Sequence, residues 1–248
     1  MDDFLIFQLA GPLAAWGEIA VGGDRATADR PTRSAVLGLV AAAVGVPRDD
    51  NARQLAVFDG YRVAVLTVSP GDLVRDYHTT QVPPHSALRG RPMRTRLDQL
   101  EALAAHRVER GAAGEAILSC RDYRCDGAWL VALTASPQAP YPMSELREAL
   151  LCPHFSLYLG RKSCPPMRPL CPQVISAPDL VSALGQATFP ELGRPLADAD
   201  LYWEPGIEPG TTPQDTAQRW DAPVSRERWQ FRPRLELHAR LHEVPPCS

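Results

Sequence analysis

The chain has 248 residues, and its 26 basic and 29 acidic side chains give a formal net charge of −3. This length allows one large domain or two small ones, and 45% hydrophobic residues are too many for a disordered chain. No apolar stretch reaches the roughly 18 residues needed to cross a bilayer, and the balanced charge argues against a uniformly basic nucleic-acid binder.

The first part of the chain predicts two strands around a helix. Residues 4–9 are apolar and end at a Gly-Pro pair, which is typical of a buried strand. Thr32 can cap the helix that follows, and apolar residues fill this helix from 35 to 44. Residues 61–68 alternate and are β-branched, and residues 73–79 are their expected partner across a Pro-Gly turn.

In the middle of the chain, the predicted secondary structure changes twice. Residues 80–114 are rich in Pro and Arg and then become helical. The pattern of residues 115–134 predicts a β-hairpin with its turn at residues 126–127. Ser144 is expected to head a short helix, and residues 155–159 predict a short strand.

The last part combines a short helix, an acidic Pro-rich region and closing strands. The expected ranges are a helix over 178–184, a long loop or small subdomain over 186–223, and strands over 228–232 and 235–241.

This order of elements resembles a β-α-β-β-α-β plan with a large insertion. We therefore predict an α+β fold with a ferredoxin-like, RRM-like core. The predicted divisions are a core over 1–79 and 115–178, an inserted hairpin and helix over 80–114, and a loop-rich region with closing strands over 179–248. An open sheet face of this kind is often used by nucleic-acid modules.

The balanced total charge conceals segments of opposite sign. Five arginines oppose one aspartate over residues 75–96, and five oppose two carboxylates over residues 224–240. Residues 179–223 hold eight carboxylates and two arginines. These segments fit a protein that contacts a polyanion on one side, or solvated loops of both signs.

Six cysteines do not indicate a disulfide framework in a chain of this length. The N-terminus is acidic and lacks the pattern of a signal peptide, so we expect a cytoplasmic protein with reduced thiols and no cofactor. A zinc cluster is a weaker alternative, because Cys164 and Cys171 have six residues between them and structural zinc pairs usually leave two to four. Its ligands would be Cys152, His154, Cys164 and Cys171.

Two segments have the chemistry of a phosphate site. Gly160 lets backbone N–H groups approach an anion, and the Arg-Lys-Ser that follows (161–163) supplies charge and donors. Lys162 is the only lysine of the chain. Residues 31–34 lie at a predicted helix start, where free N–H groups, hydroxyls and Arg33 make a second candidate, or a plain helix cap.

Residues 75–79, Arg-Asp-Tyr-His-Thr, allow two functions. His78 as general base and Tyr77 as a positioning group would suit a metal-independent ribonuclease. Either ring could instead stack on a nucleic-acid base. An ordinary polar strand end is the third interpretation.

The motifs together resemble a known family. The sequences 9–12, 15–17, 31–34, 75–79, 158–165 and 225–229 match, in order, signatures of the Cas family five, RAMP-superfamily subunits (the CasD family) of type I-E CRISPR surveillance complexes, called Cascade. The resemblance covers nearly the whole chain.

This resemblance implies a ferredoxin-like RAMP core with a projecting thumb, and a subunit that binds the 5′ handle of the crRNA in antiviral defence. It also implies contact with the backbone and large subunits, and only indirect contact with target DNA. The implied RNA-binding residues are Trp16, Thr32, Arg33, Ser34, Arg75, Tyr77, His78, Gly160, Arg161, Lys162 and Ser163. The thumb residues would be Arg89, Arg91, Arg94 and Arg96.

Three hypotheses follow. The first is a binding subunit of the complex without enzyme activity. The second is an endoribonuclease that processes CRISPR repeat RNA with Tyr77 and His78, because a relative of the family in type I-C systems cuts RNA. The third is a general single-strand binder that acts alone.

Overall fold

A computed structural model describes residues 1–18, 23–88, 90, 95–110, 115–192, 198–225 and 230–241. The chain divides into two units. The first comprises Met1–Gly17, Thr27–Val74 and Tyr123–Ser248, and the second comprises Glu18–Ala26 and Arg75–Asp122.

The first unit is built on an antiparallel sheet. Its strand order is β6 (Gln173–Ala177), β1 (Asp2–Ala14), β5 (Glu115–Ala135), β3 (Tyr61–Ser69), β7 (Ala199–Trp203), β9 (Gln230–Leu241) and β8 (Asp215–Ser225). Strand β1 shows why the sheet is buried on both sides: Leu5 and Phe7 join one apolar core, whereas Phe4 and Ile6 join the other. The fold is therefore a mixed α/β structure with a large antiparallel sheet.

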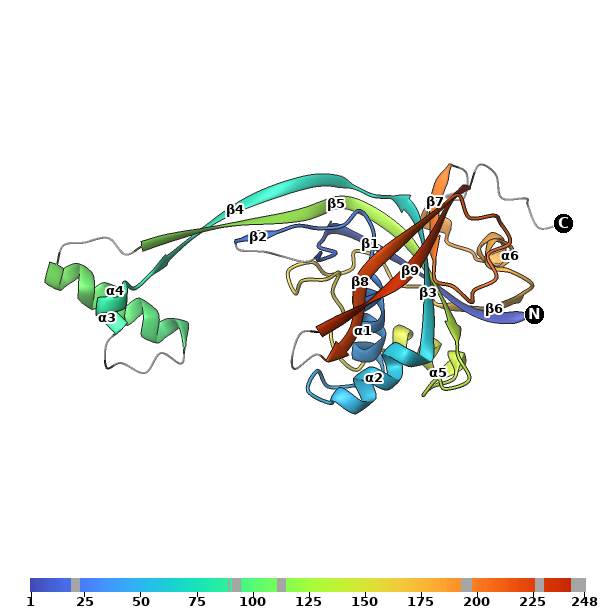
Figure 1. Cartoon of the computed structure of the whole chain (residues 1–248), viewed down its shortest axis with the longest axis horizontal. Helices are drawn as coiled ribbons and strands as arrows, with labels where there is room; N and C mark the ends of the chain where they lie inside the picture. The colour runs from blue at the N-terminus through green and yellow to red at the C-terminus, as the bar shows by residue number, and fades with distance from the viewer. Residues whose placement is uncertain are drawn as a thin grey trace. The chain divides into compact units, whose positions relative to one another are not determined.

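Helices cover both faces of this sheet. Helices α1 (Arg33–Ala43), α2 (Asn51–Gly60) and α5 (Met143–Leu151) contribute to the core on one face, where Figure 1 shows them grouped together. Helix α6 (Leu180–Gln186) and the 3-10 turn η1 (Pro190–Leu192) belong to the core on the other face.

Among its described residues, the second unit is a ribbon of strands with two helices. It contains β2 (Asp24–Arg25), α3 (His85–Leu88), α4 (Arg96–Arg110) and the parts of β4 (Asp72–Val82) and β5 that lie between Arg75 and Asp122. Strands β2 and β4 both pair with β5.

The structure confirms several predicted elements. Thr32 caps α1, and its hydroxyl accepts the N–H of Ala35 at 3.3 Å. The helices expected in the inserted segment and near residue 180 are α4 and α6, and Asp179 caps the latter through the N–H of Ser182.

Other predictions are wrong. Residues 115–135 form one continuous strand rather than a hairpin, with a left-handed Asp126 (φ +56°) in place of a reversal. Residues 72–82 do not pair with β3 in the described sheet, because both segments pair with β5. Residues 155–159 are irregular, and residues 186–223 contain β7 and part of β8. Helix α5 has no side-chain cap, so Ser144 does not head it as expected.

Candidate nucleic-acid interface

The loop between Leu159 and Cys164 is closed by its own backbone. The N–H of Leu159 donates to the carbonyl of Cys164 at 2.7 Å, and the N–H of Cys164 donates to the carbonyl of Arg161 at 2.9 Å. The side chains of Leu159 and Cys164 are both buried in the core beside α1. This loop is therefore a fixed turn whose two ends are anchored in the core.

Gly160 sets the position of this turn against β1. Its φ is +84°, and a Cβ built on it would lie 1.9 Å from the carbonyl oxygen of Ala15. The N–H of Ala15 in turn donates to the carbonyl of Leu159 at 3.0 Å. Only glycine combines this conformation with this close approach.

The turn presents polar groups at its surface. Lys162 and Ser163 are exposed. Arg161 is half-buried, and its guanidinium carbon lies 4.6 Å from the centre of the Tyr123 ring, as in a cation–π contact. An ammonium, a hydroxyl and a guanidinium are thereby held within three residues, which suits a phosphate group.

Trp16 is placed differently from the expected RNA contact. Its side chain is 1% exposed, and its ring meets that of Trp129 edge to face, with the centroids 5.1 Å apart. The backbone N–H of Trp16 donates to the hydroxyl of Thr27 at 2.8 Å. A ring buried in this way has no face left for an RNA base, so Trp16 is a core residue beside Trp129.

The start of α1 keeps two hydroxyls half-buried and turns its arginine inward. Thr32 and Ser34 lie 3.2 Å apart through their hydroxyl oxygens. Arg33 pairs with Glu204 at 2.7 Å and also donates to the carbonyls of Phe58 and Tyr61. The guanidinium therefore ties α1 to the sheet, contrary to the RNA contact expected for it.

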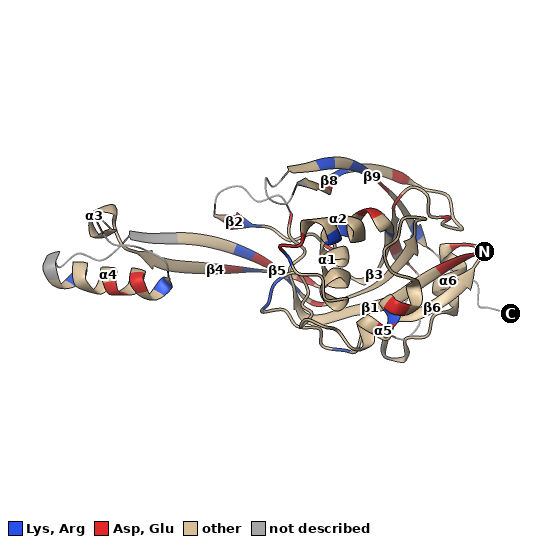
Figure 2. Cartoon of the chain, turned by 90° about the horizontal axis from the view of Figure 1, so that it is seen from below, with Lys and Arg blue, Asp and Glu red and all other residues tan. Residues whose placement is uncertain are grey.

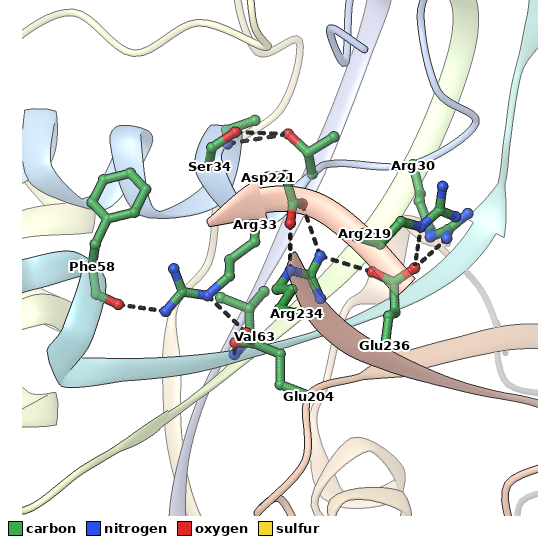
Figure 3. A network of polar contacts seen from close by, with 12 residues as sticks. Arg30, Arg33, Ser34, Phe58, Val63, Glu204, Arg219, Asp221, Arg234 and Glu236 are labelled. Atoms are coloured by element: carbon green, nitrogen blue, oxygen red, sulfur yellow. Dashed lines mark hydrogen bonds and ion pairs between the residues drawn. The ribbon is translucent and has the colours of Figure 1, made fainter. Parts of the chain in front are cut away.

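A buried ionic network links the segment before α1 to the hairpin β8–β9 (Figure 3). Glu236, 9% exposed, accepts hydrogen bonds from Arg30, Arg219 and Arg234. Arg234 also forms a bidentate pair with Asp221, at 2.6 and 2.9 Å. Burial raises the pKa of Glu236, but the charges and hydrogen bonds of Arg30 and Arg234 outweigh it and leave this pKa below its usual 4.5.

This network shows that described arginines of the basic segment 224–240 are paired with carboxylates of the protein. Arg234 is neutralised inside the protein, and Arg232 lies 3.4 Å from Asp59 of α2. Figure 2 accordingly shows basic and acidic segments side by side along β8 and β9. Arg226 and Arg228 lie outside the described residues. Within the acidic region, Glu204 and Asp221 are internal partners of Arg33 and Arg234, whereas Asp179 caps α6.

Strand β4 separates the residues of the motif 75–79 onto two faces. Arg75 forms a bidentate pair with Asp122 at 2.8 and 3.0 Å, which raises the pKa of Arg75. Tyr77 is 69% exposed, and His78 contacts the carboxylate of Asp76. Neighbouring residues of a strand point to opposite faces, so Tyr77 and His78 do not converge on one point.

The thumb residues are described only in part. Arg96 begins α4 and donates to the side chain of Gln99 at 2.7 Å and to the carbonyl of Gln81 at 2.9 Å. Arg89, Arg91 and Arg94 lie outside the described residues.

The residues of the suggested zinc cluster do not come together as a metal site. Within the described ranges, no three His, Cys, Asp or Glu side chains are grouped so that they could hold a metal ion. Cys164 is buried, whereas Cys152 and Cys171 are exposed. Among the described helices, none is long and apolar enough to cross a membrane.

The comparisons with known proteins agree with one another. The model of the family described as CRISPR-associated protein (Cas5) matches residues 4–235, and the chain belongs to this family. One relative is the CRISPR system Cascade subunit CasD of Escherichia coli (strain K12). It is 37% identical over 208 residues, which cover 84% of each chain.

Two solved structures are similar in fold. A chain described as "CRISPR RNA-guided surveillance complex" has a TM-score of 0.64 at 22% identity, covering 96% of this chain and 90% of its own. A chain described as "Crystal structure of Cas protein" has a TM-score of 0.58 at 25% identity, covering 98% of both.

Proposed function

We propose that this protein is the crRNA-binding subunit of a type I-E CRISPR surveillance complex and holds the 5′ handle of the crRNA. The observation that carries the proposal is the fixed turn at Gly160, which presents Lys162 and Ser163 to solvent. Membership of the Cas5 family and the likeness to a Cascade subunit support it.

The proposal extends to partners and location. Its partners are the crRNA, the backbone subunits and the large subunit of the complex, with target DNA reached indirectly, in the cytoplasm. We also propose that the strands β1, β3, β5 and β6, with helices α1 and α5, form a ferredoxin-like RAMP core. Along the chain these elements follow in the order β1, α1, β3, β5, α5, β6, which is strand, helix, strand, strand, helix, strand. The segment 80–114 is its thumb insertion, and 179–248 is its C-terminal region.

Lys162→Ala is expected to weaken crRNA retention by the assembled complex about tenfold, because a charge-assisted phosphate contact is lost. Its measurement is the crRNA that remains on the immobilised complex during a salt titration. Ser163→Ala should have a smaller effect in the same direction. Arg53→Ala, which removes a cation from the surface of α2, is the control and should leave retention unchanged. Equal retention by Lys162→Ala and the parent would refute the phosphate site.

We expect the subunit to bind RNA without cutting it. Tyr77 and His78 lie on opposite faces of β4, so they do not converge as the base and positioning group that the ribonuclease hypothesis needs. The purified chain, incubated with the cognate repeat RNA in EDTA between pH 6 and 8, should leave the RNA intact. Cleavage that disappears in His78→Ala would establish the ribonuclease instead.

A further inference from the structure

The strand ribbon of the second unit separates its charged side chains onto two faces. The bidentate pair places Arg75 and Asp122 on the same face. Alternation along β5 then places Cys120 on that face and Arg121 on the opposite one.

Strand β2 extends both faces. It pairs with β5 in parallel register, with Asp24 beside Cys120 and Arg25 beside Arg121. Cys120 hydrogen-bonds to the carboxylate of Asp24, and burial together with this bond raises the pKa of the thiol. One face therefore carries Asp24, Asp122 and Arg75. The other carries Arg25, Arg121 and, by alternation from Arg75, Asp76.

The juxtaposition of two arginines is unfavourable in itself. Side chains at facing positions of neighbouring strands lie close together, and like charges there destabilise the pairing. Both residues are exposed, and Arg25 donates to the backbone carbonyl of Asp24 at 3.0 Å. An anion that contacts both guanidinium groups would turn this repulsion into attraction, and planar guanidinium donors suit phosphate oxygens.

We propose that the Arg25–Arg121 face of the ribbon is a second binding site for the RNA phosphate backbone. This inference rests on the proposed function. Alternation from Arg75 places His78 on the Arg25–Arg121 face as well, with Asp76 as its neighbour. The opposite face, with two carboxylates and one guanidinium, repels a polyanion. Arg75 is then a structural tie to Asp122, and Arg25 and Arg121 replace it as RNA contacts.

The test uses the complete complex assembled with crRNA. In the Arg25→Gln/Arg121→Gln variant, crRNA retention should fall about tenfold, and the slope of log K against log salt should become shallower by about 1.4, since each phosphate contact on a single strand contributes about 0.7. Each single variant should show about half of this change in slope. Arg147→Gln, which removes an exposed cation of α5, is the matched control and should change neither quantity.

The outcomes separate this inference from the proposed function. Unchanged retention and slope in the double variant, with circular dichroism like that of the parent, would overturn the ribbon site. Loss of a protein subunit with RNA retention intact would overturn it too, because the face would then dock an acidic protein surface. If Lys162→Ala lowers retention while the ribbon variant does not, only the ribbon site fails. If neither variant has an effect, the proposed function fails with it.

Discussion

Replacing Glu236 by alanine is expected to lower the free energy of unfolding by about 3–5 kcal/mol, the usual cost of removing one partner from a buried ion pair. The side chains of Arg30 and Arg234 are only 9% and 12% exposed, and both donate to this carboxylate. Without it, each of these two guanidinium groups keeps a single carboxylate partner, Asp29 or Asp221, and loses a hydrogen-bond acceptor in a place that water hardly reaches. Urea unfolding at pH 7 measures the loss.

The control for this variant is Asp59→Asn. Asp59 pairs with Arg232 at 3.4 Å, but both side chains are about two-thirds exposed, so the change should cost no more than about 1 kcal/mol. Equal urea midpoints for the two variants would contradict a stabilising role of the buried network.

Lowering the pH should destabilise the parent protein in the same way as Glu236→Ala, because it protonates the Glu236 carboxylate. The pKa of Glu236 is lower in the folded protein than the 4.5 of a free carboxyl, so its contribution is complete above that pH and is lost as the pH falls through the folded value. In Glu236→Gln this part of the pH dependence should be absent. A parent and a Glu236→Gln variant that lose the same stability as the pH is lowered below 4.5 would contradict this assignment.

Gly160→Ala is the second change with a large expected effect. A left-handed conformation costs an alanine about 1–2 kcal/mol, and the added methyl group would also overlap the carbonyl oxygen of Ala15 at 1.9 Å. The turn has to move away from β1, and Lys162 moves with it. We expect a loss of stability of roughly 2–4 kcal/mol together with reduced crRNA retention.

Gly17→Ala is the matched control, because a Cβ at Gly17 meets nothing within 4 Å. Thermal unfolding and crRNA retention are measured for both variants. A Gly160→Ala protein as stable as Gly17→Ala, with full retention, would show that the turn does not depend on its glycine.

Elements with strong local signals could be predicted from the sequence. The cap at Thr32 and the apolar residues after it define α1, and Asp179 defines the start of α6, since hydroxyl and carboxylate caps act within three residues. Helix α2 was missed because its start depends on the single cap Asp50, and its buried face includes the polar Gln54. The dipeptide Asp126-Gly127 is chemically a turn, yet pairing of β5 with β1 and β3 on either side keeps the chain extended.

In the candidate site, too, local features could be predicted from the sequence, whereas contacts between residues distant in sequence could not. Gly160 and the basic residues after it predicted a candidate phosphate site or a basic turn, and the structure shows a turn there that its own backbone closes. Phosphate binding at this turn stays a prediction. The inward turn of Arg33 could not be foreseen, since its partner Glu204 lies 171 positions later in the chain. The pairing of Arg25 with Arg121 was missed as well, because only the register of two strands distant in sequence brings them together.

The position of β1 in the sheet has a consequence for synthesis of the chain. Its apolar residues pair with β5, from Leu5 opposite Leu133 to Ala14 opposite Arg124, and with β6, which begins at Gln173. More than half of the chain therefore has to leave the ribosome before the first strand finds its neighbours. Until then an apolar segment with unpaired backbone groups is exposed, which is the condition under which nascent chains aggregate or recruit chaperones. Expression of the protein should consequently respond to chaperone supply and to temperature more than its folded stability alone indicates.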